Sequence, residues 1–179
     1  MKFYKSDFNF IIINKGFFIF LITLTSFVFL SFTLPKNVSK KVTKSIKKTF
    51  NVTNFTLKTI DLDVDTNVIN SNNFCSIHKE DEIIGYALID KAASKMLDFD
   101  YLVLLNPELE IVTIKILIYR EEHGNEISSK RWLKQFFGLK INDRAILNKN
   151  IDGISGATIS VRSMTKKIDD LLIDLKVVN

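Results

Sequence analysis

The feature that most constrains this chain is an uncharged apolar segment from residue 16 to residue 34. It reads GFFIFLITLTSFVFLSFTL, and Lys15 and Lys36 bound it on either side. A helix of this length extends for about 28 Å, which is enough to cross the hydrocarbon core of a bilayer. Apart from small hydroxyl side chains the segment is apolar all round, so it lacks the polar face of a helix at a globular surface. We therefore predict one transmembrane helix over 16–34.

A cleaved signal peptide is the alternative interpretation, because residues 1–15 are basic and precede the apolar run. The run is longer than a typical signal-peptide core of about 7–15 residues, and no A-x-A-like cleavage site follows it at 34–36. We therefore predict a short basic tail over 1–15 and an uncleaved single-pass anchor in the inner (cytoplasmic) membrane, which makes the membrane a partner of the chain.

The charge of the chain is divided unevenly along its length. Residues 1–50 carry nine lysines and one acidic residue, a net charge of +8, whereas residues 51–179 carry 16 basic and 19 acidic residues, a net charge of −3. A nucleic-acid-binding domain needs its basic residues on the folded part of the chain, so nucleic acid is not an expected partner. We expect a lysine-rich stalk over 35–54, followed by one folded domain over 55–179.

The lysines on either side of the apolar segment are evidence for its orientation in the membrane. Three precede the segment and six follow it, and a plain count would place the domain at 55–179 in the cytoplasm.

The chain has one cysteine and two histidines, which excludes an internal disulfide and a Cys/His zinc site. We predict no metal site.

Residues 55–179 alternate between strand-like and helix-like patterns. We expect short strands at 55–60 and 83–89, and a hairpin of 99–105 with 109–119 that turns at Asn106-Pro107-Glu108. The β-branched run 111–118 is typical of a central strand that is buried on both faces. Ser128 or Ser129 begins a short helix that ends at Gly138, and a final amphipathic helix covers about 160–176. These elements predict an α+β domain: a small, mostly antiparallel sheet with flanking helices, preceded by the transmembrane helix.

One motif ahead of the final helix indicates chemistry. Residues 152–160 read DGISGATIS, which places small residues and hydroxyls at a helix N-terminus. Unpaired backbone N–H groups and the helix dipole favour an anion there, and small side chains let a phosphate approach the backbone. The same residues are compatible with a plain helix cap, in which Thr158 or Ser160 is the N-cap residue and the glycines form a turn.

Two catalytic interpretations of this motif are excluded. A nucleophile elbow around Ser155 requires a histidine later in the chain, but His78 and His123 both precede it. The chain also lacks a G-x-x-x-x-G-K-[ST] loop and a G-x-G-x-x-G motif after a strand, which excludes the common nucleotide-triphosphate and dinucleotide folds.

The motif DGISGATIS resembles the attachment motif of the FMN-binding domain family, which includes the flavin-bearing subunits of the sodium-translocating NADH:quinone reductase and of the related ion-pumping ferredoxin:NAD reductase. In that family a flavin transferase that uses FAD esterifies the motif's threonine to the phosphate of FMN. The resemblance implies that Thr158 carries covalent FMN. The flanking residues implied to bind the cofactor are Asp152, Ser155, Gly156, Ala157 and Ile159.

A second stretch supports the resemblance. Residues 119–124, with the aromatic helix that follows, are similar to the family's acidic-glycine loop, which implies cofactor contacts from Glu121, His123 and Gly124. The common family loop has Thr-Pro-Gly after its glutamate, whereas this chain has Glu122-His123-Gly124. Two readings stay open for the aromatic side chains of Tyr119, Trp132 and Phe136, which either stack on the flavin or pack in the core.

The resemblance implies a membrane-anchored, extracytoplasmic flavoprotein that takes part in electron transfer. It implies a redox carrier rather than a stand-alone catalyst, because the cofactor supplies the chemistry. The expected partners are a flavin transferase for maturation and membrane or extracytoplasmic redox proteins. The extracytoplasmic placement opposes the lysine count. The alternative is a membrane-anchored sensory or binding module of the same fold, with loosely bound flavin or none.

Overall fold

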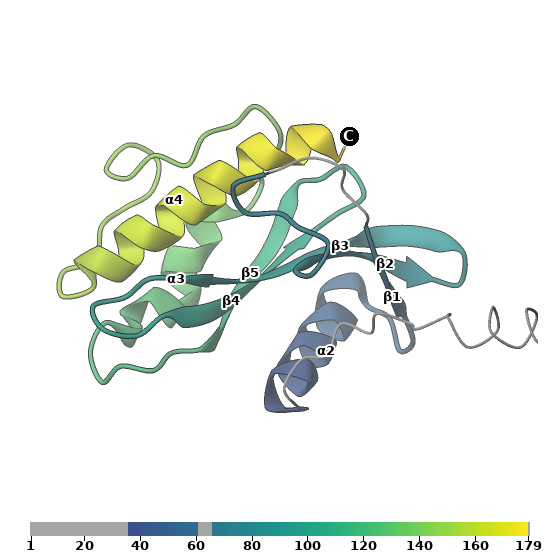
Figure 1. Cartoon of the computed structure of the whole chain (residues 1–179), viewed down its shortest axis with the longest axis horizontal. Coiled ribbons are helices and arrows are strands. Elements are labelled where there is room, and N and C mark those ends of the chain that lie inside the picture. The colour runs from purple at the N-terminus through teal and green to yellow at the C-terminus, as the bar shows by residue number, and fades with distance from the viewer. Residues whose placement is uncertain (1–35, 61–65, 179) are drawn as a thin grey trace, which may run out of the picture. The chain divides into compact units, whose positions relative to one another are not determined.

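The computed structural model describes residues 36–60 and 66–178, which form a five-stranded antiparallel sheet with helices on both faces (Figure 1). The strands follow one another in sheet order, so each pairs with its neighbour in sequence. They are β1 (Thr56–Thr59), β2 (Phe74–Lys79), β3 (Glu82–Ala92), β4 (Phe99–Leu105) and β5 (Ile111–Ile118). The predicted α+β class is confirmed. Among the described residues no helix has the length and apolar character that a bilayer crossing needs, and the membrane helix predicted over 16–34 lies outside them.

Three helices and three short 3-10 turns complete the part of the chain that the structure describes. The helices are α2 (Lys36–Phe50), α3 (Lys130–Leu133) and α4 (Thr158–Asp174), and the turns are η1 (Asn125–Ser128), η2 (Lys134–Phe136) and η3 (Leu175–Val177). Helices α3 and α4 cover one face of the sheet, and α2 covers the other. The apolar side chains of α4 recur at intervals of three and four residues, so they form one buried stripe. Its members include Val161, Met164, Ile168, Leu171 and Leu172.

The hairpin of β4 and β5 forms where the sequence predicted it. Its turn closes through a hydrogen bond from the backbone N–H of Asn106 to the carbonyl of Glu110 (3.0 Å), and the Asn106 side chain accepts from the N–H of Glu110 (2.8 Å). Strand β4 is buried at every position, because its alternate side chains enter the two cores on opposite faces of the sheet.

The expectation of a central strand at 111–118 was wrong. Strand β5 lies at the edge of the sheet, and several of its side chains are only half buried. Its side chains do pack into the cores on both faces, Ile111 and Ile114 on one and Leu117 on the other, although the strand has a neighbour on one side only. The backbone of Gly138 and Leu139 protects part of this edge, since both bond to Ile111 at 2.8–2.9 Å. Strand β2, which the sequence did not predict, is one of the three interior strands of the sheet, with β3 and β4.

Residues 36–50 differ from the polar stalk that we expected over 35–54. They form helix α2, which packs on the sheet through Val38, Val42 and Ile46, each at most 3% exposed. An interval of four residues places these three side chains on one side of a helix. The lysine-rich stretch therefore has an apolar face, a short stripe that the surrounding lysines obscured in the sequence.

Candidate functional site

The N-terminus of α4 is open to an anion. Helix α4 begins at Thr158, and no side chain caps it at the N-cap residue Ala157. The N–H groups of Thr158, Ile159 and Ser160 have no acceptor among the described residues, as expected for the first turn of a helix. The Thr158 side chain is exposed, and its hydroxyl bonds to none of the described residues. The alternative in which Thr158 or Ser160 caps the helix is therefore wrong.

The turn before α4 depends on Gly156. This residue has a φ of +84°, a left-handed conformation that glycine adopts without steric cost. A Cβ atom built at Gly156 would meet nothing within 4 Å, so the space in front of the turn is empty of protein. The backbone is thus accessible to a ligand at the residue two positions before Thr158.

Three hydroxyl groups from different segments meet behind Thr158. The Oγ atoms of Ser94 and Ser160 are 2.7 Å apart, and the phenol oxygen of Tyr119 is 3.1 and 3.2 Å from them. The phenol also donates to the carbonyl of His123 (2.9 Å). Because the single phenol proton is used in this bond, Tyr119 can only accept from the serines, and the two serine protons can satisfy at most two of the three oxygen–oxygen contacts at one time. The cluster joins the β3–β4 loop, the end of β5 and the first turn of α4.

Gly124 brings the 121–124 loop against the helix N-terminus. Its φ is +86°, and an added Cβ would lie 2.5 Å from the Tyr119 hydroxyl and 3.7 Å from the Cα of Ala157. Both the backbone conformation and the lack of space require glycine here. Glycine at position 124 therefore allows the 121–124 loop to pack against Tyr119 and Ala157.

Glu121 holds the β3–β4 loop rather than pointing a free carboxylate at a ligand. Its Oε1 atom accepts hydrogen bonds from the backbone N–H groups of Met96 (2.7 Å) and Leu97 (3.0 Å). These bonds, from Leu97 and then Met96, lower the pKa of Glu121 because they stabilise its charged form. The neighbouring Arg120 binds both carboxylate oxygens of Asp100, at 3.1 and 2.7 Å.

Two adjacent hollows open at this site and share part of their lining. The smaller has a volume of about 210 Å³ and lies at the N-terminus of α4, and the larger, of about 590 Å³, extends over the β3–β4 loop. Both are lined by Lys95, Glu121, His123 and Gly156. The smaller hollow adds Ser94, Tyr119, Ala157, Thr158, Ile159 and Ser160, and the larger adds Met96, Leu97, Arg120 and Glu122.

These hollows fit the two ends of FMN. The smaller offers unpaired N–H groups, and Lys95 lies on its wall, which suits a phosphate. The larger carries exposed apolar side chains on its wall, Met96 at 83% and Leu97 at 52% exposure, and these suit a flat aromatic ring. Ile159, 51% exposed, adds apolar surface beside Thr158.

The structure brings most of the predicted site residues together. Glu121, His123, Gly156, Ala157, Thr158 and Ile159 line the hollows, and Gly124 lies directly behind. Asp152 and Ser155 line neither hollow. Instead, the backbone of Asp152 accepts a hydrogen bond from the indole of Trp132 (2.8 Å) and donates one to the side chain of Gln135 (2.8 Å).

Sequence reasoning missed Ser94, Lys95 and Ser160 as parts of the site. Ser160 stands inside the recognised motif, and its position one turn into a helix could have indicated an inward hydroxyl. Ser94 and Lys95 carry no such signal, since only the folding of the sheet brings the β3–β4 loop to α4.

Trp132 and Phe136 are 3% and 0% exposed and pack edge to face, with ring centres 5.2 Å apart, so they belong to the core. Tyr119 lines the smaller hollow.

A comparison of the sequence with models of protein families shows to which family the chain belongs. The family model described as FMN-binding domain matches residues 59–173, which is well over half of the chain. The chain belongs to the FMN-binding domain family. The matched range includes every residue that lines the two hollows, whereas helix α2 lies outside it. No curated protein matches the chain. As a member of the FMN-binding domain family, the chain is a flavin-binding protein.

Proposed function

We propose that the chain carries FMN covalently on Thr158, through a phosphoester, and passes electrons between membrane and extracytoplasmic redox proteins. The observation that supports this proposal is the state of the Thr158 hydroxyl. It is exposed at the first position of α4, bonds to none of the described residues and stands beside three unpaired N–H groups. A hydroxyl in this place is accessible to a modifying enzyme without unfolding of the domain.

Attachment requires a flavin transferase that uses FAD. The Thr158 oxygen forms a bond to the phosphorus of the FMN half as the phosphoanhydride bond of FAD breaks. The hydroxyl proton passes to a base of the transferase, and AMP leaves. No net oxidation or reduction takes place in this step, so the flavin enters in the redox state of the FAD.

The domain's own residues would hold the phosphate and orient the ring. The N–H groups of Ile159 and Ser160 can donate to phosphate oxygens, and the α4 dipole favours the negative charge. Glu121 holds the Met96–Leu97 segment that forms a wall of the larger hollow. FMN supplies the electron-accepting and electron-donating chemistry when it is bound. A covalent bond retains the cofactor even in shallow hollows such as these.

A direct test compares matched hydroxyl variants of the full chain co-expressed with a flavin transferase. We expect flavin fluorescence in the denatured protein band for the wild type and for Thr158→Ser, which keeps a hydroxyl. Thr158→Ala should be dark. Thr53→Ala removes an exposed hydroxyl outside the motif and both hollows and should stay bright. A bright Thr158→Ala band would place the attachment elsewhere.

A second candidate function is a sensory or binding module with loosely bound FMN. The observation that favours it is the openness of the site together with Glu122-His123-Gly124 in place of the common loop. Protein that is yellow when native but leaves a dark band after denaturation, with or without the transferase, would support this candidate and contradict covalent attachment.

We propose further that residues 16–34 anchor the chain in the inner membrane, with the domain on the extracytoplasmic side. The apolar segment supports anchoring, and the family resemblance supports the side, against the lysine count. A phosphatase reporter fused after the C-terminal Asn179 should be active, since that enzyme folds outside the cytoplasm. Activity of a cytoplasm-specific reporter at the same position would reverse the orientation.

A further inference from the structure

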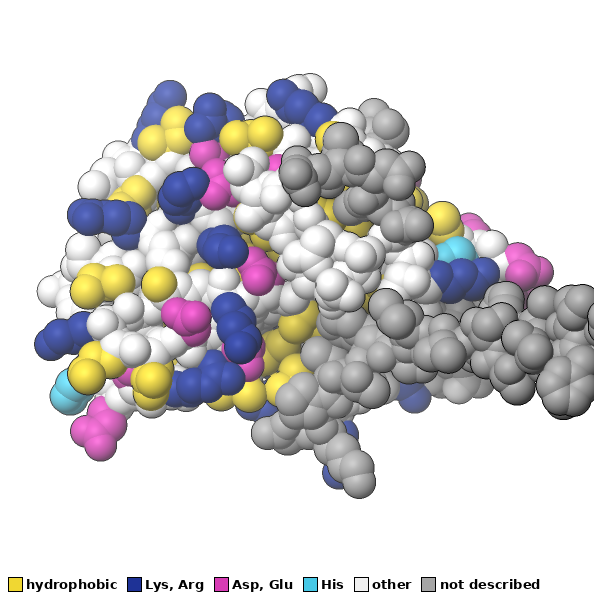
Figure 2. All heavy atoms as spheres, in the orientation of Figure 1, with side chains coloured by type: hydrophobic (Ala, Val, Ile, Leu, Met, Phe, Trp, Pro, Cys, Tyr) yellow, Lys and Arg dark blue, Asp and Glu magenta, His cyan; other side chains and the backbone are white. Residues whose placement is uncertain are grey.

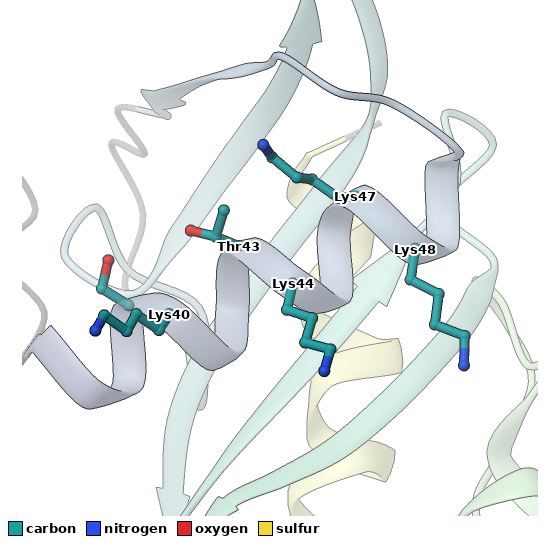
Figure 3. Close-up of a pocket in the computed structure, with 6 residues that line it drawn as sticks. Lys40, Thr43, Lys44, Lys47 and Lys48 are labelled. Atoms are coloured by element: carbon teal, nitrogen blue, oxygen red, sulfur yellow. The ribbon is translucent and has the colours of Figure 1, made fainter.

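Helix α2 carries a row of lysines along its exposed side. The helix has six lysines among 15 residues and no acidic residue. Four of them, Lys40, Lys44, Lys47 and Lys48, line one shallow depression and are named here the lysine face. In Figure 3, Lys44 and Lys48 project side by side from successive turns.

The lysine face has no counter-charge among the described residues. The ion pairs found there join Arg120, Arg144, Lys166 and Lys167 to carboxylates of the sheet and of α4, and none includes a residue of the lysine face. Figure 2 shows that Lys and Arg side chains alternate with Asp and Glu over the surface around α4. The lysine face therefore differs from the surface around α4 in carrying one sign of charge.

This arrangement is unfavourable within the chain itself. Lys44 and Lys48 are four residues apart and project side by side in Figure 3, so their ammonium groups repel each other. The repulsion also acts on Lys115 of strand β5. Its pKa is lowered mainly by burial and further by the positive charges of Lys41, Lys44 and Lys48. An anion from outside the chain would relieve this repulsion.

The chemistry of the side chains indicates which anion. All the cations of α2 are lysines, which are compact, strongly hydrated charges suited to a diffuse layer of phosphates. The lysine face has neither the arginine forks nor the aromatic anchors that are typical of protein interfaces. In sequence, α2 begins two residues after the apolar segment 16–34 ends.

We propose that the lysine face docks on the anionic phospholipid headgroups of the membrane and holds the domain against the bilayer surface. This inference rests on the proposed anchoring by 16–34 but not on the proposed flavin.

Docking through α2 would orient the whole domain, because α2 is fixed to the sheet. Its apolar stripe packs on Leu102, Leu104 and Leu117, and Lys41 donates a hydrogen bond to the carbonyl of Leu117. The core that contains α4 lies on the opposite face of the sheet. The site at Thr158 would thus remain accessible to a redox partner while α2 contacts lipid.

The first test measures lysine reactivity in the full chain. The protein is placed in lipid nanodiscs of phosphatidylcholine alone or mixed with phosphatidylglycerol, acylated briefly, and analysed residue by residue by mass spectrometry. In the anionic discs we expect acylation of the lysine face to fall about fivefold, the effect of one lysine held at an anionic surface. High salt, with a Debye length of about 3 Å, should restore it. The exposed Lys130, Lys134 and Lys149 serve as internal controls and should not change.

Each alternative result has a distinct meaning. Equal reactivity of the lysine face in both kinds of disc would overturn the proposal. Protection that occurs in native membrane vesicles but never in pure lipid would also overturn it, and would indicate an acidic protein partner. Failure of the chain to elute with either disc would instead contradict the anchoring by 16–34.

A second test uses variants and a fluorescent label on the exposed Thr53→Cys, which follows the end of α2 that is farther in sequence from the segment 16–34. The native Cys75 is buried, and burial raises the pKa of its thiol to about 12, so labelling is selective. A quencher attached to lipid headgroups should quench this label in anionic discs. Glutamine at all four positions of the lysine face should abolish the quenching, whereas glutamine at Lys130, Lys134, Lys140 and Lys149 should not. Unchanged quenching in the first variant would contradict the proposal, provided that its circular dichroism is native.

Discussion

The two faces of the sheet are built differently. The face that packs against α3 and α4, the α4 face, is rich in aromatic side chains. These include Phe74, Phe99, Tyr101, Trp132 and Phe136. The face that packs against α2, the α2 face, buries mainly aliphatic side chains and one cysteine. The α4 face therefore holds its helix through a large, mixed core, and the α2 face holds its helix through a narrow stripe.

The two faces also differ in the hydrogen bonds that hold their helices. Both ends of α4 are held: Ser160 enters the hydroxyl cluster, and the buried carboxylate of Asp174 accepts from Asn67 Nδ2 (3.0 Å) and from the N–H groups of Val68 (2.6 Å) and Ile69 (3.3 Å). On the α2 face, Thr49 bonds to Thr113 (3.1 Å), and Lys41 bonds to a backbone carbonyl. The face that bears the candidate flavin site is thus the one whose helix is fixed at both ends, and a positioned cofactor would require this.

The largest expected effect comes from equal truncations on the two faces. Ile168 and Ile46 are both fully buried, on α4 and α2 respectively. Ile168→Ala should lower the free energy of unfolding by about 4 kcal/mol, because the surrounding core cannot collapse into the cavity. Ile46→Ala should cost about 2 kcal/mol, because α2 can shift or open locally. Urea denaturation of the full chain in non-ionic detergent measures both, and equal costs would contradict the contrast between the faces.

Removing the carboxylate of Asp174 should cost somewhat less. Asp174→Ala leaves three donors near a buried site without their acceptor, and we expect a loss of about 2–3 kcal/mol. Thr49→Val, which removes the hydroxyl pair of the α2 face, should cost less than about 1 kcal/mol. Hydrogen exchange at the amides of Val68 and Ile69 should accelerate in the first variant only.

The glycines of the site predict a smaller and more local effect. Gly156→Ala places a side chain in open space and should cost about 1 kcal/mol, the penalty of a left-handed backbone. Gly124→Ala adds a clash with the Tyr119 hydroxyl and should cost about 2 kcal/mol or slightly more. Flavin fluorescence per denatured chain should fall further in Gly124→Ala. A greater loss in Gly156→Ala would mean that access at the turn matters more than the position of the loop.

The smallest effects come from charge and have opposite signs on the two faces. Hydrogen bonds from Arg144 lower the pKa of Asp169, so its contribution to stability is present at neutral pH and is lost as the pH falls through the lowered folded-state pKa. Asp169→Asn should lower stability by less than about 1 kcal/mol at neutral pH, and the difference should shrink below about pH 4. Lys44→Gln removes a charge that repels that of Lys48, and should raise the free energy of unfolding by about 0.5 kcal/mol at low salt. Urea titrations over pH and salt test both, and a destabilising Lys44→Gln would contradict the repulsion on the lysine face.

The α4 face was easier to predict from sequence than the α2 face. The stripe that includes Met164 and Ile168 has the period of a long helix, and the hairpin turn at Asn106-Pro107 has a distinct signature. The stripe of α2 is only three residues long and lies among lysines, so its charge dominated the interpretation. Strand β2 was missed because polar residues such as Ser76 and His78 interrupt its apolar pattern, although both are buried.

The sequence predicted those residues of the candidate site that lie in short local motifs. Thr158 and its neighbours lie in one motif, and Glu121 and His123 lie in a second. What sequence could not predict is the meeting of Ser94, Tyr119 and Ser160, since that depends on the sheet bringing three separated segments together. Asp152 was assigned to the cofactor by its place in the motif, yet its backbone bonds to the α3–η2 segment.

The contact between Lys41 and Leu117 also determines the order in which the domain can be assembled during synthesis. The two residues are 76 positions apart, so α2 leaves the ribosome well before the strand on which it packs. At about 5–20 residues per second, the helix waits for roughly 4–15 seconds before β5 exists. Leu102 and Leu104, on which its apolar stripe also packs, emerge during that interval. The packing of α2 is therefore complete only after β5 has been made, although α2 is the first described element of the sequence.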